Sequence, residues 1–227
     1  MQFEILVEGV SDKTTLWHVL PKILGPRGQP HLWNIRKHQG IGRLPDDPDV
    51  RTKITDNTLL GQLPIKLRAY EETLDRDAIV VVLVDLDGKD ETVFRTQLEN
   101  LVARMTHRLN VLVCFAIEET EAWYLGDQMA LFKAFPEAQH RKSLVDGYVL
   151  DDPACGTWEL LVRITLGQDP AILRKRGRYE SGEIKVQLAN KISPHMDVET
   201  NRSPSFQAFR NRLRKTVGLP TPLSKPA

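Results

Sequence analysis

The sequence predicts an α/β fold: a mostly parallel sheet flanked by helices, with a smaller basic helical region at the C-terminus. Six of the seven residues in the stretch Ile79–Asp85 are aliphatic, and four of them are Val. A run without polar alternation is typical of a central strand that is covered on both faces. Strand-like runs then alternate along the chain with helix-like stretches, which favours parallel strands joined by right-handed crossovers.

Three further strands and three helices are expected around this central strand. The first strand, 3–7, ends at Glu8, and a helix then begins near Ser11 or Asp12, both good N-caps. Apolar residues at helical spacing predict two later helices. The other strands are expected at 31–38 and 110–117, and these helices at 58–74 and 90–109.

The second half of the chain is expected to be helical. Residues 136–156 lack periodic apolar positions and are interpreted as a connector, whereas Thr157–Leu166, 182–192 and the stretch from Ser203 onward have helical patterns. We therefore predict an α/β domain over residues 1–135 and a basic helical region packed on it over 136–218. The tail, 219–227, contains three prolines and is expected to be disordered.

Composition limits the class of protein. Hydrophobic residues make up 41% of the 227 residues, which is enough for a core. No run approaches the roughly 18 apolar residues of a membrane span, and the first residues read as a strand and not as a signal peptide. The two cysteines form neither a metal-ligand set nor a disulfide framework. We expect a cytoplasmic protein without a membrane segment.

The net charge of +1 conceals an uneven distribution. Residues 172–227 hold 12 Lys and Arg against 4 Asp and Glu, and the remainder holds 19 against 26. A solvated, Arg-rich helical face would explain the basic segment, which could equally hold a polyanion against the acidic part. Candidate nucleic-acid contacts are Arg174, Arg176, Arg178, Arg210 and Arg214, with Lys37 and Arg43 beside two glycines as further phosphate contacts.

Acidic residues follow three of the predicted strands. Parallel strands have their carboxyl ends at one edge of the sheet, where ligands bind in open α/β folds. If strand geometry persists, residues two apart point to the same side and can share one cation. The acidic residues are Glu8 and Asp12 after the first strand, Asp85 and Asp87 after the central strand, and Glu118, Glu119 and Glu121 after the last.

Local structure explains some of these acids one at a time. Asp-x-Asp-Gly is compatible with a simple turn, Asp12 with an N-cap, and one or two of the glutamates with the first turn of a helix. None of these accounts explains why three strands all end in acids. Converging carboxylates repel one another without cations, so we favour a site for a hard divalent ion.

Four ordered motifs resemble those of a known family. They are LVEGVSD at residues 6–12, VLVDLDG at 82–88, AIEETEAWYLGD at 116–127 and NRSPSF at 201–206, and they cover nearly the whole chain. The set looks like the Toprim-like domain-of-unknown-function family 4276. Glu8-Gly9 followed by Asp85-x-Asp87 resembles the Rossmann-like Toprim fold shared by topoisomerases, DnaG-type primases and OLD-family nucleases. The chain lacks the additional domains of the topoisomerases and primases.

The resemblance implies a Mg²⁺ or Mn²⁺ site used for phosphodiester chemistry. If the roles of the matching Toprim residues apply to this chain, Glu8 would be the acid/base or metal-bound glutamate. Asp85 and Asp87 would be the Mg²⁺ ligands, and Asp12 the extra acid of the nuclease branch. Glu119 and Glu121 are our choices to complete the ligand set. Lys185, or a neighbouring Arg, would neutralise the charge that builds on the phosphate.

The leading hypothesis is therefore a Mg²⁺-dependent nuclease acting on DNA or RNA. A partner ATPase is implied by the resemblance, because related Toprim nucleases often work beside one and the chain has no Walker A motif. A role in phage defence is a family-level expectation, and a homodimer is left open. The alternatives are a non-catalytic binding module with a Toprim-like fold and a phosphohydrolase of a small nucleotide.

Overall fold

The computed structural model describes residues 1–49, 55–151 and 156–221, apart from the side chains of Arg174, Arg176, Arg178 and Tyr179. Its centre is a four-stranded sheet in the order β2-β1-β3-β4, with every pair parallel. The strands are β1 (Gln2–Val7), β2 (Leu32–Lys37), β3 (Ile79–Asp85) and β4 (Asn110–Ala116). The predicted α/β class and all four predicted strands are confirmed.

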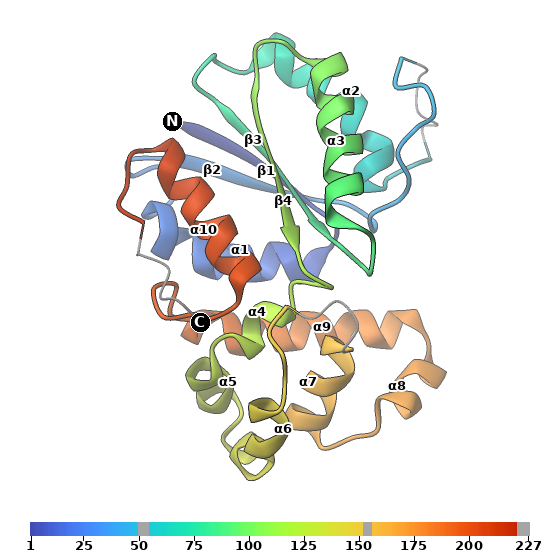
Figure 1. The fold of residues 1–227 in the computed structure, drawn as a ribbon, viewed down its shortest axis with the longest axis vertical. Coiled ribbons are helices and arrows are strands. Elements are labelled where there is room, and N and C mark those ends of the chain that lie inside the picture. The colour runs from blue at the N-terminus through green and yellow to red at the C-terminus, as the bar shows by residue number, and fades with distance from the viewer. Residues whose placement is uncertain (50–54, 152–155, 222–227) are drawn as a thin grey trace.

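Helices cover both faces of the sheet (Figure 1). α2 (Leu59–Thr73) and α3 (Glu91–Met105) share a core with the even-numbered residues of β1 and β3, such as Leu6 and Val82. α1 (Val10–Leu24) and α10 (Pro204–Thr216) cover the other face, where the odd-numbered residues Ile5 and Val81 point. The central strand is therefore buried on both sides, as its unbroken apolar run predicts.

The remaining helices form a second group beside the carboxyl edge of the sheet (Figure 1). The region 136–156, expected to be a connector, is largely helical where it is described. A further helix, Pro170–Arg176, lies between the two predicted helical stretches Thr157–Leu166 and 182–192. The group consists of α4 (Ala122–Leu125), α5 (Gln128–Ala134), η1 (Pro136–Arg141), α6 (Lys142–Asp146), α7 (Thr157–Leu166), α8 (Pro170–Arg176), α9 (Arg178–Ile192) and η2 (Ser193–His195).

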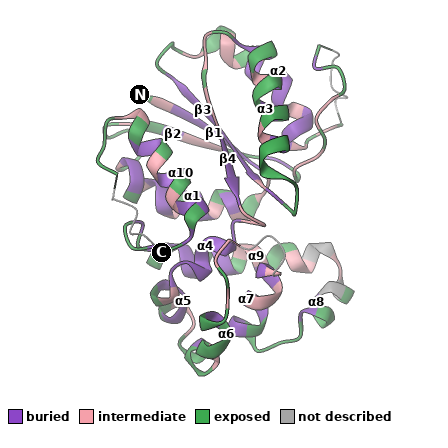
Figure 2. Cartoon of the chain, in the orientation of Figure 1, coloured by how far each residue is buried: buried purple, intermediate pink, exposed green. Residues whose placement is uncertain are grey.

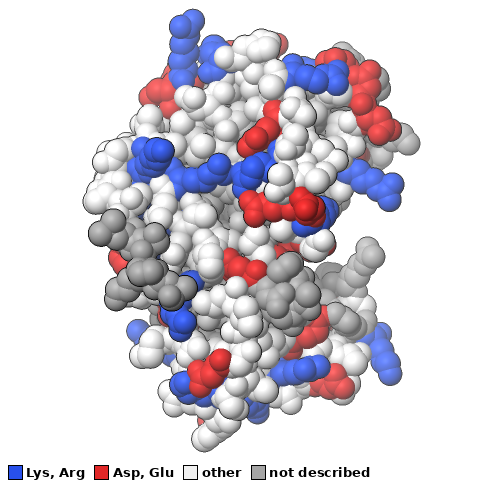
Figure 3. Space-filling model, viewed as in Figure 1, with Lys and Arg blue, Asp and Glu red and all other residues white. Residues whose placement is uncertain are grey.

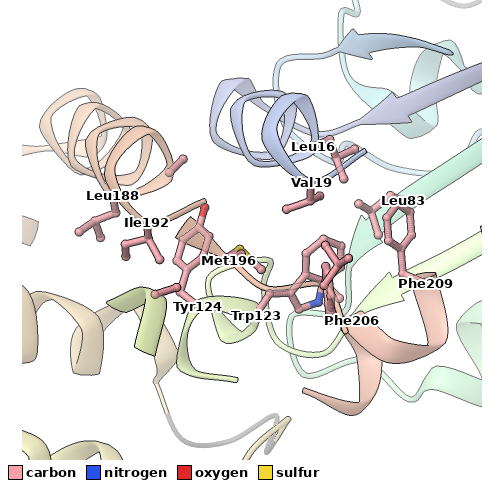
Figure 4. Close-up of a cluster of buried hydrophobic side chains, with 14 of the residues drawn as sticks. Leu16, Val19, Leu83, Trp123, Tyr124, Leu188, Ile192, Met196, Phe206 and Phe209 are labelled. Atoms are coloured by element: carbon pink, nitrogen blue, oxygen red, sulfur yellow. The ribbon is translucent and has the colours of Figure 1, made fainter. Parts of the chain in front are cut away.

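One hydrophobic core runs from the sheet into this helical group. Trp123 of α4 lies between Phe206 and Phe209 of α10, with ring centroids 5.2 and 5.3 Å away (Figure 4). Leu83 of β3 belongs to the same cluster, as does Leu188 of α9. Buried residues accordingly continue from the sheet through α4 to α9 (Figure 2). None of the described helices combines the length and the apolar composition that crossing a bilayer requires.

Two of the recognised motifs join α4 to α10. The Nδ2 of Asn201 donates to the Trp123 carbonyl at 2.8 Å, and the backbone N–H of Arg202 donates to the Gly126 carbonyl at 2.9 Å. A Cβ on Gly126 would lie 2.4 Å from the Asn201 Oδ1, so the close approach requires glycine. Ser203 then caps α10 by accepting from the Phe206 N–H. These contacts fix the 123–126 segment against residues 201–203, which precede α10.

Candidate metal centre at the carboxyl edge of the sheet

Glu8 and Asp85 meet where β1 and β3 end. The Glu8 Oε1 accepts a hydrogen bond from the Asp85 backbone N–H at 2.8 Å. Burial raises the pKa of Glu8 to about 8; the Asp85 hydrogen bond opposes this rise, whereas the charges of Asp12 and Asp87 add to it. Burial, followed by the charges of Asp12 and Glu8, also raises the pKa of Asp85 well above its ordinary value. Two carboxyl groups thus lie together with little solvent to stabilise their charge.

Asp12 approaches the same place from the first turn of α1. The helix begins at Val10 with Gly9 as its N-cap, so the prediction that Ser11 or Asp12 caps it is wrong. Asp12 is instead the third helical residue, and its Oδ2 accepts from the Gly9 N–H at 2.8 Å, a reciprocal capping contact. Its Oδ1 accepts from the Thr120 hydroxyl at 2.8 Å. The capping contact accounts for the position of only one of the two Asp12 carboxylate oxygens, Oδ2.

The three glutamates of the turn after β4 contact two different helices. Glu118 has a left-handed backbone, with φ of 60°, and its carboxylate accepts from the Thr157 N–H at 3.0 and 3.1 Å. It therefore stabilises the N-terminus of α7. Glu119 and Glu121 turn the other way and pair with Lys185 of α9. The turn is short because Ala122 already begins α4.

Lys185 is the cation of this acidic cluster, which we define as Glu8, Asp12, Asp85, Glu119 and Glu121. Its Nζ donates to Glu119 Oε2 and lies 3.5 Å from Glu121 Oε2. Burial alone would lower the pKa of Lys185, but the charges of Glu121, Glu119 and Asp85 outweigh it and raise that pKa well above its ordinary value. Burial and the charge of Glu121 raise the pKa of Glu119 to about 7, against the lowering effect of Lys185. Among the described residues, Lys185 is the ammonium group that forms ion pairs with the acidic cluster, and it does so through two of the five carboxyl groups, Glu119 and Glu121.

Four carboxyl groups in the acidic cluster each have one oxygen held by the protein and a second that takes no hydrogen bond from the described residues. The held oxygens are Glu8 Oε1, Asp85 Oδ1, which accepts from the Thr120 N–H at 3.1 Å, and Glu119 Oε2 and Glu121 Oε2, which face Lys185. Glu121 is 1% exposed, and its Oε1 is buried without a partner. A buried carboxylate oxygen without a donor is costly unless a cation satisfies it.

The chemistry of this donor set fits a hard divalent cation, which prefers carboxylate oxygens. In the parts of the chain that the structure describes, no three Asp, Glu, His or Cys side chains are in a ready metal-ligating arrangement. Binding would therefore have to draw the free oxygens of the acidic cluster together. Residues that could hold the ion are Glu8, Asp12, Asp85 and Glu121, with Glu119 after release from Lys185.

Asp87 departs from the expected geometry. β3 ends at Asp85, and Asp87 has a left-handed backbone, with φ of 46°, so strand alternation does not extend to it. Its side chain is 54% exposed and lies 3.7 Å from the Lys89 Nζ. Asp87 stands on the rim of the site, and the prediction that it shares the direction of Asp85 by strand periodicity is wrong.

The predicted basic contacts separate into three groups. Lys37 and Arg43 are exposed, and the loop between them is tied to the site because the Gly40 N–H donates to the Glu8 carbonyl at 2.9 Å. Arg174, Arg176 and Arg178 fall in α8 and α9, but their side chains lie outside the described residues. On the face shown in Figure 3, basic and acidic side chains are interspersed over both parts of the molecule.

Arg210 and Arg214 require a correction. Arg210 is 2% exposed, and its guanidinium donates to the carbonyls of Val198 and Glu199. Arg214 is 8% exposed and forms a two-pronged pair with the Glu199 carboxylate. Both side chains hold the 197–201 loop against α10 and do not face solvent, so they are not available to bind nucleic acid. The sequence pattern of α10 places both residues near the border of its apolar face, where a long cationic side chain can be either exposed or buried.

Sequence reasoning missed two polar residues of the site. Thr120 contacts Asp12 and Asp85, and the Tyr124 hydroxyl lies 2.5 Å from the Thr15 hydroxyl behind the acidic cluster. Burial, followed by the charge of Glu121, raises the pKa of Tyr124 well above its ordinary value. The only sequence signal was their position within the Glu118–Leu125 motif, since neither residue type suggests metal binding.

Comparison with known proteins gave one family. The family model described as "Domain of unknown function (DUF4276)" matches residues 7–214. This span contains every residue of the acidic cluster, together with Lys185. No match was found among curated proteins or among solved structures.

Proposed function

Because the chain belongs to the DUF4276 family and gathers its acidic motifs at one edge of the sheet, we propose that it is a Mg²⁺-dependent phosphodiesterase. In this proposal it is a Toprim-type nuclease related to the OLD family, cleaves DNA or RNA, and works with a partner ATPase. Mn²⁺ would substitute for Mg²⁺. The Toprim relationship, the substrate and the partner come from the resemblance of the motifs, and the acidic cluster supports the metal.

The observation that carries the proposal is the excess of carboxyl groups over cations. Among the described residues, the five carboxyl groups of the acidic cluster have one ion-paired ammonium group, Lys185, and the buried Glu121 Oε1 has no hydrogen-bond partner. Burial raises the pKa of Glu8 to about 8. A purely structural cluster would be expected to pair its charges, because an unpaired buried charge costs several kcal/mol. A bound divalent ion would restore the balance and lower these pKa values.

Each side chain has a part in this proposal. Glu8, Asp12, Asp85 and Glu121 would hold the ion, and Asp87 would contact it or its water from the rim. A bound divalent ion would supply a polarised water and charge stabilisation at the phosphate. Lys185 would offer its ammonium to the phosphate oxygens once Glu119 and Glu121 turn toward the metal. Exposed Lys37 and Arg43 would contact phosphates farther along the strand.

The test is cleavage of plasmid, linear and single-stranded DNA and of RNA with Mg²⁺ or Mn²⁺. Asp85→Asn keeps the shape of the side chain and removes a charge that faces the cluster; we expect a loss of at least about 100-fold, typical of removing an essential electrostatic group. Glu118→Gln is the matched control, because Glu118 belongs to the same turn but points to α7.

Two results would count against the proposal. Equal cleavage by wild type and Asp85→Asn would assign the activity to another site or to a contaminant. No cleavage in any metal, repeated with a candidate ATPase partner and accompanied by the absence of Mn²⁺ binding in calorimetry, would leave a non-catalytic binding module as the better account.

A further inference from the structure

Thr120 contacts three carboxyl groups of the acidic cluster. Its backbone N–H donates to Asp85 Oδ1 at 3.1 Å, and its hydroxyl donates to Asp12 Oδ1 at 2.8 Å. The same hydroxyl lies 3.4 Å from Glu121 Oε2. Thr120 is 1% exposed, so both polar groups are used within the protein.

We propose that Thr120 is a positioning residue for divalent-ion binding, and this inference rests on the proposed function. It joins carboxylates from α1 and β3, and it does so from the turn after β4. It occupies one oxygen of Asp85, and the second oxygen takes no hydrogen bond from the described residues. With the Gly9 N–H it also fixes Asp12 at both oxygens, which sets the plane of that carboxylate.

Thr120 is 1% exposed, so solvent has little access to replace its hydroxyl. Tyr124 is fully buried, and its hydroxyl lies 2.5 Å from that of Thr15, so α1 and the 120–125 segment are also joined on the inner side. If the Thr120 hydroxyl were removed, Asp12 would lose a buried donor with no solvent to restore it. Asp12 would then rotate about its side-chain bonds, and its oxygens would no longer present a fixed geometry to the ion.

A merely structural threonine would behave differently. Its removal would lower the stability of the fold and leave the affinity of the remaining carboxylates for metal unchanged. Partners that orient metal ligands typically change metal affinity by about 10–100-fold when they are mutated. Metal affinity measured on folded protein therefore separates the two roles.

The experiment is calorimetric titration of metal-free protein with Mn²⁺ alone. Thr120→Val keeps the shape and removes the hydroxyl, and we expect binding about 10–100-fold weaker than wild type. Thr120→Ser retains the hydroxyl and is expected to bind within about threefold of wild type, since it keeps the donor to Asp12 Oδ1. Thr165→Val is the control: this buried threonine donates to the Leu161 carbonyl inside α7, away from the acidic cluster, and its loss should leave the affinity unchanged.

The outcomes separate the two proposals. Equal Mn²⁺ affinity in wild type and Thr120→Val would overturn the positioning role and leave the nuclease proposal standing. Weakened binding in Thr120→Val, restored in Thr120→Ser, would support it even if no substrate were cleaved. No Mn²⁺ binding by wild type would overturn both. If Thr120→Val does not fold, Thr120→Ala against Thr120→Ser provides the same comparison.

Discussion

The excess of carboxylates predicts that Glu8 weakens the metal-free fold at neutral and alkaline pH. Its pKa rises from 4.5 to about 8 on folding, so the folded protein holds the proton more tightly than the unfolded chain does. Unfolding then releases protons between these values, and the free energy of unfolding falls as the pH rises through that window. Glu8→Gln cannot ionise, and Gln still offers an oxygen to the Asp85 N–H. We therefore expect Glu8→Gln to stabilise the metal-free protein.

The size of the stabilisation expected from Glu8→Gln follows from the shift in the pKa of Glu8. One pKa unit corresponds to about 1.36 kcal/mol, so the change from 4.5 to about 8 sets an upper limit of about 5 kcal/mol on the gain above pH 8. Asp85 lies against Glu8 and also retains protons more strongly on folding, so the two share this cost. We expect a gain of about 2 kcal/mol near pH 8, falling to about zero near pH 4.5.

Urea unfolding with chelator present, from about pH 5 to about pH 8.5, measures this difference. The stability of wild type should fall relative to Glu8→Gln as the pH rises, and added Mg²⁺ should restore wild type while leaving the variant nearly unchanged. A variant that is less stable than wild type at every pH would refute the reasoning. It would mean that the Glu8 carboxylate is a net stabilising group and that its negative charge is not unfavourable in the metal-free acidic cluster.

Three further predictions concern neighbouring positions. Lys185→Met should lower stability by about 3 kcal/mol at neutral pH, because it leaves buried carboxylates unpaired; a metal-free unfolding curve identical to wild type would contradict it. Glu118→Gln should cost about 1 kcal/mol through the weakened N-terminus of α7, with Mn²⁺ affinity unchanged in calorimetry; altered affinity would place Glu118 in the metal site. Arg210→Met should lower the melting temperature by several degrees, because the buried contacts to the 197–201 loop are lost. It should not change the salt dependence of nucleic-acid binding; a weaker salt dependence in the variant would mean that Arg210 contacts the nucleic acid.

The sheet could be predicted from the sequence because its signals were local and strong. The Val-rich run of β3 and the acids at three strand ends required only strand polarity to bring Glu8 and Asp85 together. Lys185 was expected to neutralise the charge that builds on the phosphate; the structure places it beside Glu119 and Glu121, and its role toward a phosphate stays a prediction. The catalytic roles of these residues remain proposals.

The missed features depend on information that periodicity does not contain. Strand alternation does not reach Asp87, whose backbone is left-handed two residues after β3, and a short polar turn gives no pattern from which to infer this. The direction of Glu118 depends on α7, which is more than thirty residues later in the sequence. The burial of Arg210 depends on a loop folding over α10. In each case tertiary contacts override the local signal.

The placement of Lys185 also has a consequence for synthesis of the chain. Every carboxylate of the acidic cluster has been synthesised once residue 121 is added, but Lys185, which pairs with Glu119 and Glu121, comes 64 residues later, and α10, which packs against Trp123, follows last. Domains generally begin to fold from the N-terminus during translation. The emerging sheet would therefore carry an acidic edge without a counter-charge, and we expect it to remain open, or to depend on cellular magnesium, until the C-terminal third of the protein arrives.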